Sequence, residues 1–114
     1  MDYQTATKFL IAQGTARITR KPDAFLMLLE QKKPPIAGQM TSILLALKVA
    51  FDALQAEEYL HRPLASALYL LSVESQQLFL EGLRAGVSWP PLLKEDIQRI
   101  DKGVRSILSG AWEE

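Results

Sequence analysis

The residues that could form a metal site lie in the segment EEYLHR, which spans residues 57–62. Glu58 and His61 have the Glu-x-x-His spacing that places two ligands on one face of a helix. Carboxylate-bridged di-metal bundles use two such motifs and two further glutamates, but this chain has a single histidine. Pro63 also predicts that a helix ends just before His61. We therefore interpret His61 as an exposed residue at a helix end, and we expect no metal and no cofactor.

Candidates for covalent or acid–base catalysis are equally few. The chain contains no cysteine, so a thiolate nucleophile and a disulfide are both excluded. A Ser-His-Asp arrangement would depend on His61, which lies at an unsuitable helix end. The acidic pairs Glu57–Glu58 and Glu95–Asp96 are adjacent in sequence, so their carboxylates diverge on a helix. These patterns predict a protein that is not an enzyme and has no catalytic residues.

A candidate phosphate-binding loop is QKKPPIAGQMTSILLALK, residues 31–48. Nucleotide-binding loops of the Gly-x-x-x-x-Gly-Lys-Ser/Thr type follow a buried strand, and this segment has neither the Lys-Ser/Thr pair nor the strand. Its two prolines disfavour helical geometry in the residues before them, and Gly38 allows the chain to turn before the next helix. We interpret the segment as helix punctuation. The alternative is a binding loop in which Lys32 and Lys33 contact an anion at the helix N-terminus.

A basic turn, RITRK, contains Arg17, Arg20 and Lys21 between two expected helices, as in some DNA-binding proteins. Together with Lys32 and Lys33 it could contact a phosphate backbone. However, the chain has 13 basic and 13 acidic residues, and no long basic face with interleaved aromatic residues accompanies the turn. Weak nucleic-acid binding is therefore a further alternative and not the leading hypothesis.

The elements that would position these residues are all expected to be helices. The sequence has no stretch of period-two alternation and no hairpin signal. The expected helices cover about 2–17, a short stretch after Pro22, 38–59, 63–85, and a range from within 89–97 to just before Gly110. The last helix has the clearest apolar stripe, formed by Leu93, Ile97, Ile100, Val104 and Ile107. The chain is thus expected to be one all-α domain, residues 1–114, with four long helices and one short helix.

Three small residues are expected to have specific packing or capping roles in these helices. Gly14 shares the inward stripe of the first helix with Tyr3, Ala6 and Leu10. Gly86 is placed to close the fourth helix in a left-handed cap. Ser75 lies on the apolar stripe of the fourth helix, where a small residue permits close approach, and its hydroxyl is expected to bond to the carbonyl of Leu71.

The third and fourth expected helices are apolar on more than one side. Such helices should be the central pair of the bundle, flanked by the first and the fifth, unless another chain buries the excess apolar surface. The possible interaction surface consists of Leu45, Val49, Leu70, Val73, Leu80 and Trp112. The leading hypothesis is a non-enzymatic interaction module that self-associates, with a dimer favoured and an unknown protein partner as another possible occupant of this surface. The alternative is a small-molecule-binding bundle with an apolar pocket between these two helices.

Two further features bear on location. The longest uncharged apolar run, near Ile43, ends at Lys48, which is far short of the roughly 20 residues that span a bilayer. No basic leader followed by an apolar block is visible after Met1. We therefore expect a cytoplasmic protein without a membrane partner. Basic residues are in excess in residues 1–50 and acidic residues in residues 51–114, which we interpret as scatter over solvated faces.

The segments PDAFLMLLEQKKPPIAGQMTSILLALK and GVSWPPLL resemble a small conserved all-helical protein family of photosynthetic bacteria whose role is not established. The resemblance spans nearly the whole chain, and it implies an all-helical fold without a motif of known chemistry. Some members carry the label dethiobiotin synthase. That enzyme is much longer and uses ATP through a phosphate-binding loop on a parallel sheet. This sequence has neither feature, so the label is physically implausible here.

Overall fold

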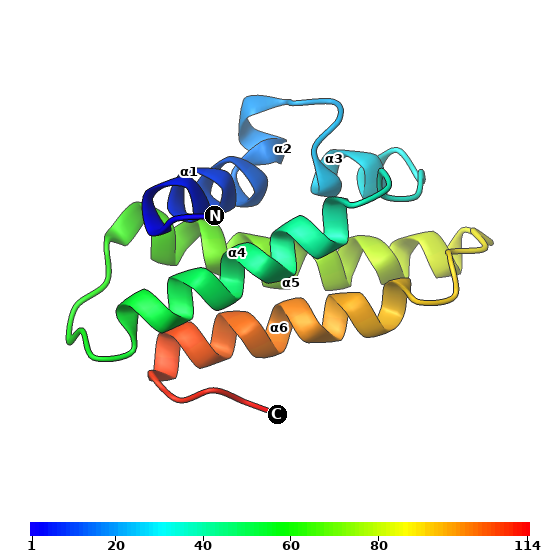
Figure 1. The fold of residues 1–114 in the computed structure, drawn as a ribbon. Helices are drawn as coiled ribbons and strands as arrows, with labels where there is room; N and C mark the ends of the chain where they lie inside the picture. Colours follow the sequence, from blue (N-terminus) through cyan, green and yellow to red (C-terminus); the bar gives the residue numbers. More distant parts are fainter.

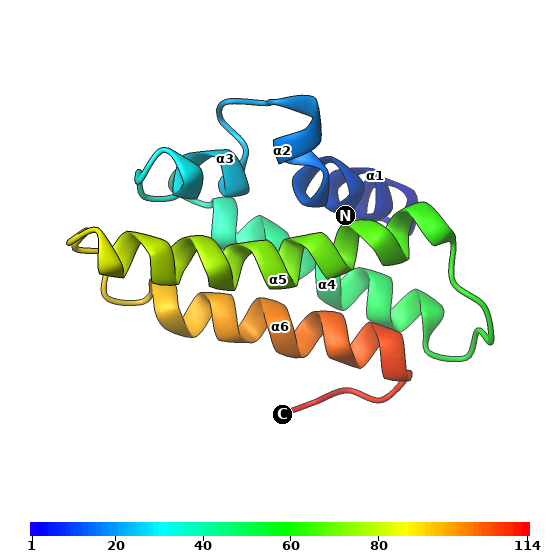
Figure 2. The ribbon, with the colours of Figure 1, turned by 180° about the vertical axis from the view of Figure 1, so that it is seen from behind.

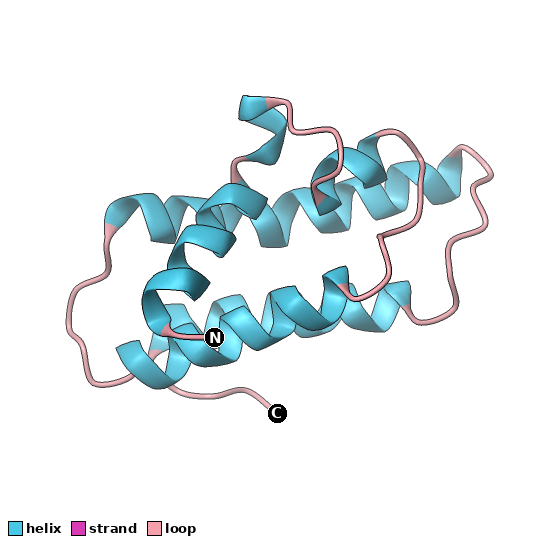
Figure 3. Cartoon of the chain, turned by 45° about the horizontal axis from the view of Figure 1, so that its top comes forward, coloured by secondary structure: helices cyan, strands magenta, loops and turns pink.

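The computed structural model describes all 114 residues, and the chain is all-α, as predicted. The helices are α1 (Tyr3–Gly14), α2 (Ala16–Thr19), α3 (Phe25–Glu30), α4 (Gln39–Leu54), α5 (Arg62–Arg84) and α6 (Leu93–Ser109). Helices and loops account for the whole chain, without a strand (Figure 3). The short helices α2 and α3 lie between α1 and α4, so the chain has one more short helix than expected (Figure 1). None of the six helices combines the length and the apolar content needed to cross a bilayer.

The four longer helices surround one core in the cyclic order α1, α4, α6, α5. Helix α1 packs against α4 and α5, and α6 packs against the same two helices on the other side (Figures 1 and 2). Helices α4 and α5 therefore face each other diagonally, and the prediction that they form a central pair is wrong. Helix α4 is apolar on two sides because it has two neighbours within the same chain, whereas the second apolar side of α5 stays partly exposed.

Helix α1 begins at a capped end and finishes earlier than expected. The backbone N–H of Thr5 donates to Oδ1 of Asp2 at 2.7 Å, and this hydrogen bond lowers the pKa of Asp2. The helix ends at Gly14, not near Arg17, and α2 follows as a separate turn. A Cβ atom at position 14 would lie 2.1 Å from the carbonyl oxygen of Ala67. A glycine is therefore required where α1 meets α5.

The segment between α3 and α4 is helix punctuation, as interpreted from the sequence. The N–H of Lys33 donates to the carbonyl of Leu28 at 2.8 Å, and the N–H of Lys32 donates to that of Leu29 at 3.0 Å. This pair of bonds is the usual left-handed helix cap. Lys32 occupies its left-handed position, with φ of 62°, and Gly38 has φ of 83° directly before α4.

Helix α3 begins at Phe25 and not directly after Pro22, and every residue from Phe25 to Leu29 is buried. Helix α4 begins where expected but ends at Leu54 and not near Tyr59. The side chains from Gln55 to Tyr59 are exposed, so continuing the helix would bury nothing. It would also place acidic residues at the negative end of the helix dipole.

The ends of α5 and α6 agree with their sequence signals. Gly86 has φ of 85°, and the N–H of Val87 donates to the carbonyl of Gly82 at 2.8 Å, so the predicted cap is confirmed. Gly110, with φ of 79°, follows α6, and its N–H donates to the carbonyl of Ser106 at 2.9 Å. The five predicted stripe residues of α6 are all buried. Ser75 is fully buried on α5, but its hydroxyl donates to the carbonyl of Ser72 at 3.1 Å and not to that of Leu71.

Candidate functional site

The six residues predicted to form an interaction surface do not form one patch. Leu45 and Val49 lie on α4, which is diagonally opposite the helix that carries Leu70, Val73 and Leu80. Val49 is half-buried and packs against the core, whereas Leu45 is 48% exposed and is the only large apolar side chain that α4 leaves in solvent. The double-sided apolarity of α4 is thus satisfied almost entirely within the chain.

Trp112 is held against the bundle and is not a free docking residue. Its ring meets the ring of Phe51 edge to face, with 5.1 Å between the centroids. The Nζ atom of Lys48 lies 4.3 Å from the centroid of the Trp112 ring. The next residue is also fixed, because the N–H of Glu113 donates to Oγ of Ser106 at 2.8 Å. These contacts leave the Trp112 side chain 42% exposed.

Helix α5 differs from α4 because its outer face keeps several apolar side chains in solvent. Tyr69 is 60% exposed, and Leu80 and Leu83 are each 48% exposed. With Val73 and Gln76 they follow the four-three-four-three spacing of a helix-pairing seam. We call these five residues, Tyr69, Val73, Gln76, Leu80 and Leu83, the α5 seam. Figure 2 shows α5 crossing the front of the molecule with no helix over this side.

The outer face of α5 carries little charge before Leu80, and the exposed residues Glu81 and Arg84 flank Leu83 at its end. Between Pro63 and Leu80 the only charged residue is Glu74. Its carboxylate is turned to the side of the helix, where Oε2 lies 3.2 Å from Nη1 of Arg17. This stretch corresponds to about 27 Å of helix. A solvated helix face normally carries charged side chains, so the α5 seam is the strongest candidate for a contact surface.

The edge of the seam next to α6 is fixed by a hydrogen-bond network. Oγ of Ser72 donates to Oδ1 of Asp101 at 2.7 Å, and Nε2 of Gln76 donates to the carbonyl of Ser72 at 3.0 Å. Nε of Arg105 completes the network 3.2 Å from Oδ2 of Asp101. A cleft of about 160 Å³ between α5 and α6 borders Leu80. The seam is therefore carried by a rigid helix pair.

Sequence reasoning identified Val73 and Leu80 but missed Tyr69, Gln76 and Leu83. The signal that could have found them is the four-three spacing on the side of α5 opposite its buried stripe. Leu70, which was predicted with Val73, is half-buried and lies outside the seam.

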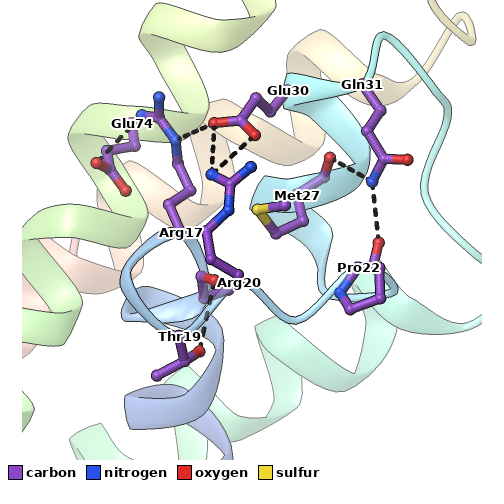
Figure 4. Close-up of polar contacts among 9 residues, drawn as sticks. Arg17, Thr19, Arg20, Pro22, Met27, Glu30, Gln31 and Glu74 are labelled. Atoms are coloured by element: carbon purple, nitrogen blue, oxygen red, sulfur yellow. Dashed lines mark hydrogen bonds and ion pairs between the residues drawn. The ribbon is translucent and has the colours of Figure 1, made fainter.

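The basic turn predicted as a possible nucleic-acid contact is occupied by carboxylates (Figure 4). Nε of Arg17 lies 3.0 Å from Oε1 of Glu30, and its Nη1 lies 3.2 Å from Oε2 of Glu74. Nη1 of Arg20 lies 3.2 Å from Oε2 of Glu30. The hydrogen bond from Arg17, with the added charge of Arg20, lowers the pKa of Glu30. The two arginines thus tie the α2 region to α3 and α5.

The remaining lysines named from the sequence are simply solvated. Lys21, Lys32 and Lys33 are exposed and form no ion pair. Lys32 and Lys33 lie in the cap after α3, and the residue before α4 is Gly38. Nothing in their geometry brings them together with the arginines of the basic turn.

The Glu-x-x-His segment does not form a metal site. Glu58 lies in the loop after α4, His61 directly precedes α5, and both side chains are exposed. Because the segment is not helical, the spacing does not place the two side chains on one face. No group of three or more potential ligands gathers anywhere in the chain.

A cavity of about 330 Å³ lies between α4, α6 and the residues after α6. The apolar pocket predicted from the sequence was placed between the helices that correspond to α4 and α5. None of the cavities is lined by both of these helices, because α4 and α5 are not neighbours. The predicted position of the pocket is therefore wrong.

Comparison with protein-family models, with curated proteins and with solved structures finds no match for this chain. The resemblance to the helical family of photosynthetic bacteria stays a prediction.

Proposed function

We propose that this protein is a non-enzymatic helical interaction module that self-associates as a dimer through the α5 seam. The observation that supports this most directly is the α5 seam itself, whose five residues are uncharged and whose three large apolar side chains, Tyr69, Leu80 and Leu83, stay in solvent. Apolar side chains on such a face lose contact with water when a partner helix packs on them, and this burial favours association.

The spacing of the seam supports a second copy of the chain as the partner. Tyr69 and Leu83 lie seven residues on either side of Gln76, with Val73 and Leu80 between them. In an antiparallel pair with the two-fold axis near Gln76, Tyr69 faces the partner's Leu83, and Val73 faces the partner's Leu80. A two-fold dimer uses one self-complementary patch on both subunits. An uncharged patch can meet its own copy without repulsion between like charges.

The size of the seam sets the expected strength of the dimer. From Tyr69 to Leu83 the helix rises about 21 Å, and a single helix pair of that length buries less than the roughly 1,600 Å² of a standard interface. The exposed rim of α6 can add contact area but not a second apolar stripe. We therefore expect a dissociation constant in the micromolar range, about 8 kcal/mol of binding free energy.

The non-enzymatic part of the proposal is supported by the residues available. The single histidine is exposed at the start of α5, and the acidic pairs in the loop after α4 and at the start of α6 are adjacent along the chain. Neither arrangement aims two titratable groups at a common cavity, which acid–base catalysis requires.

Sedimentation equilibrium from about 1 to about 200 µM protein tests the dimer with a matched pair of variants. Leu80→Glu places a charge in the seam. Leu45→Glu places the same charge on the outer face of α4, at a side chain that is also 48% exposed. We expect the average molar mass of the wild type and of Leu45→Glu to increase with concentration from 12.8 kDa towards twice that value. The average mass of Leu80→Glu should stay at the monomer value. Circular dichroism of both variants checks that the helices are intact.

Two results would contradict the proposal. A wild type that remains at 12.8 kDa over the whole concentration range would exclude self-association of the stated strength. A dimer that Leu80→Glu leaves intact, or that Leu45→Glu weakens equally, would show that the α5 seam is not the interface.

A further inference from the structure

A second feature of the molecule, distinct from the α5 seam, is the cavity of about 330 Å³ on the α4 side of α6. Its lining consists of Leu44, Leu47 and Lys48 from α4, Arg99, Lys102 and Gly103 from α6, and Trp112, Glu113 and Glu114 from the segment after α6. This segment runs back along α6 (Figure 1). The volume lies at the lower end of the range for small-molecule sites, about 300–1,000 Å³.

The floor and one wall of the cavity are apolar. Leu44 and Leu47 lie on the inner side of α4, and Gly103 allows α6 to approach closely, because a Cβ atom there would lie 3.1 Å from Cδ1 of Leu47. The indole of Trp112 forms the wall, and its edge-to-face contact with Phe51 fixes the ring. A flat apolar surface that is already held in place loses little entropy when a ligand binds to it.

The wall is anchored by contacts on α6. Oγ of Ser106 donates to the carbonyl of Lys102 at 2.7 Å and accepts from the N–H of Glu113 at 2.8 Å. The carboxylate of Glu113 also lies 3.2 Å from Nη2 of Arg105. Ser106 is fully buried, so the segment after α6 is attached to an ordered part of the bundle.

The cations at the cavity are incompletely neutralised. Lys102 forms no ion pair, and the partners of Lys48 and Arg99 are neighbours on their own helices, Asp52 at 3.2 Å and Asp96 at 2.9 Å. Exposed pairs of this kind are worth only a few tenths of a kcal/mol, so a ligand can displace them. Three cations from two helices therefore line this cavity together with two carboxylates, and one of these, Glu113, is paired with Arg105 outside the lining.

We propose that this cavity binds a small organic anion with a flat apolar body. The body lies against Trp112 and the two leucines of α4. The anionic group, a sulfonate, phosphate or carboxylate, lies among Lys48, Arg99 and Lys102. The site does not depend on the dimer, because it uses the side of α6 that faces α4 and not the side that faces α5.

Two naphthalene probes test this inference. One is 8-anilinonaphthalene-1-sulfonate, which has an apolar body and one negative charge, and the other is N-phenyl-1-naphthylamine, which has the same body without the charge. Each is titrated into ¹⁵N-labelled protein. We expect the sulfonate to shift the amide signal of Gly103 and the indole N–H signal of Trp112. The indole N–H of Trp89 serves as an internal reference, because it donates to the carbonyl of Phe79 at 3.0 Å, outside the cavity.

A matched pair of charge reversals on α6 locates the anionic group. Lys102→Glu changes a lysine of the cavity, and Lys94→Glu changes an exposed lysine on the same helix that borders the α5–α6 cleft. We expect Lys102→Glu to raise the dissociation constant of the sulfonate about tenfold, which corresponds to 1.4 kcal/mol, and Lys94→Glu to leave it nearly unchanged.

Three results would overturn the inference. The neutral probe could bind as tightly as the sulfonate, which would remove the role of the cations. The shifts could centre on Tyr69 and Leu80, which would place the probe on the α5 seam. Finally, Lys94→Glu could weaken binding as much as Lys102→Glu. That result would show that the dissociation constant of the sulfonate depends on the net charge of the protein and not on a specific site.

Discussion

The contact between α1 and α5 predicts that Gly14→Ala destabilises the protein strongly, although alanine is the better helix former. The new Cβ atom would lie 2.1 Å from the carbonyl oxygen of Ala67 and 2.7 Å from its carbonyl carbon and Cα. All three neighbours are backbone atoms of α5, so no side-chain rotation relieves the clash. The two helices must separate by about 1 Å to restore van der Waals distance.

The size of the effect follows from this separation. A gap of that width removes a quarter to a half of the dispersion energy of each contact along the α1–α5 interface. Overpacking of this kind costs about 3 kcal/mol, and the helix propensity of alanine recovers at most about 1 kcal/mol. We expect a net loss of about 2 kcal/mol, a substantial part of the 5–15 kcal/mol that stabilises a typical domain.

Urea unfolding followed by circular dichroism measures this loss. With an m-value of about 2 kcal/mol per M, the midpoint should fall by about 1 M while the slope stays unchanged. Gly103→Ala is the matched control, because that glycine is also buried in a helix but faces only the flexible side chain of Leu47, at 3.1 Å. A small shift of Leu47 accommodates the methyl group, so the free energy of unfolding of Gly103→Ala should stay within about 1 kcal/mol of the wild-type value. The reasoning would be refuted if Gly14→Ala were as stable as Gly103→Ala.

Two further changes test the caps and the ion pairs. Lys32→Gly should raise the free energy of unfolding by about 0.5–1 kcal/mol, because Lys32 has φ of 62° in the cap after α3 and glycine adopts that conformation without steric cost; an unchanged or lower urea midpoint would contradict this. Glu30→Gln should cost about 1 kcal/mol at pH 7, because Glu30 pairs with Arg17 and Arg20 while its side chain is 27% exposed. The folded-state pKa of Glu30 is lowered from 4.5, so its stabilisation is complete above pH 4.5 and is lost as the pH falls through the folded-state pKa. The two urea midpoints should therefore converge once the pH is below the folded-state pKa of Glu30, and a gap that persisted there would show that the ion pairs are not its cause.

Local signals in the sequence predicted the elements well where the local chain decides the structure. The apolar stripe of α6, its end before Gly110 and the left-handed cap at Gly86 depend only on neighbouring residues, and the structure confirms them. The start of α4 after Gly38 is confirmed for the same reason.

Features that depend on distant contacts were predicted poorly. The early end of α1 coincides with the close approach of Gly14 to Ala67, 53 positions further along the chain. The ion pair between Arg17 and Glu74 joins residues separated by 57 positions, so the sequence pattern suggested a free basic turn. The order of the helices around the core likewise depends on which faces meet, and periodicity alone does not specify it.

The exposed surfaces were also predicted only in part, because their exposure depends on distant contacts. The sequence indicated excess apolar area on two helices, but an apolar residue that faces a neighbour within the chain and one that faces solvent look alike in a helical pattern. Val49 belongs to the first kind and Leu80 to the second. The cavity was missed because one of its walls, Trp112, reaches it by a reversal of the chain after α6.

The cyclic order of the helices has a consequence for synthesis on the ribosome. Helix α1 is made before α4 and α5, yet it lies between them, so its apolar stripe has no complete binding partner until α5 has emerged. The core around α1 can therefore be completed only after α5 has emerged, although α1 can already pack against α4.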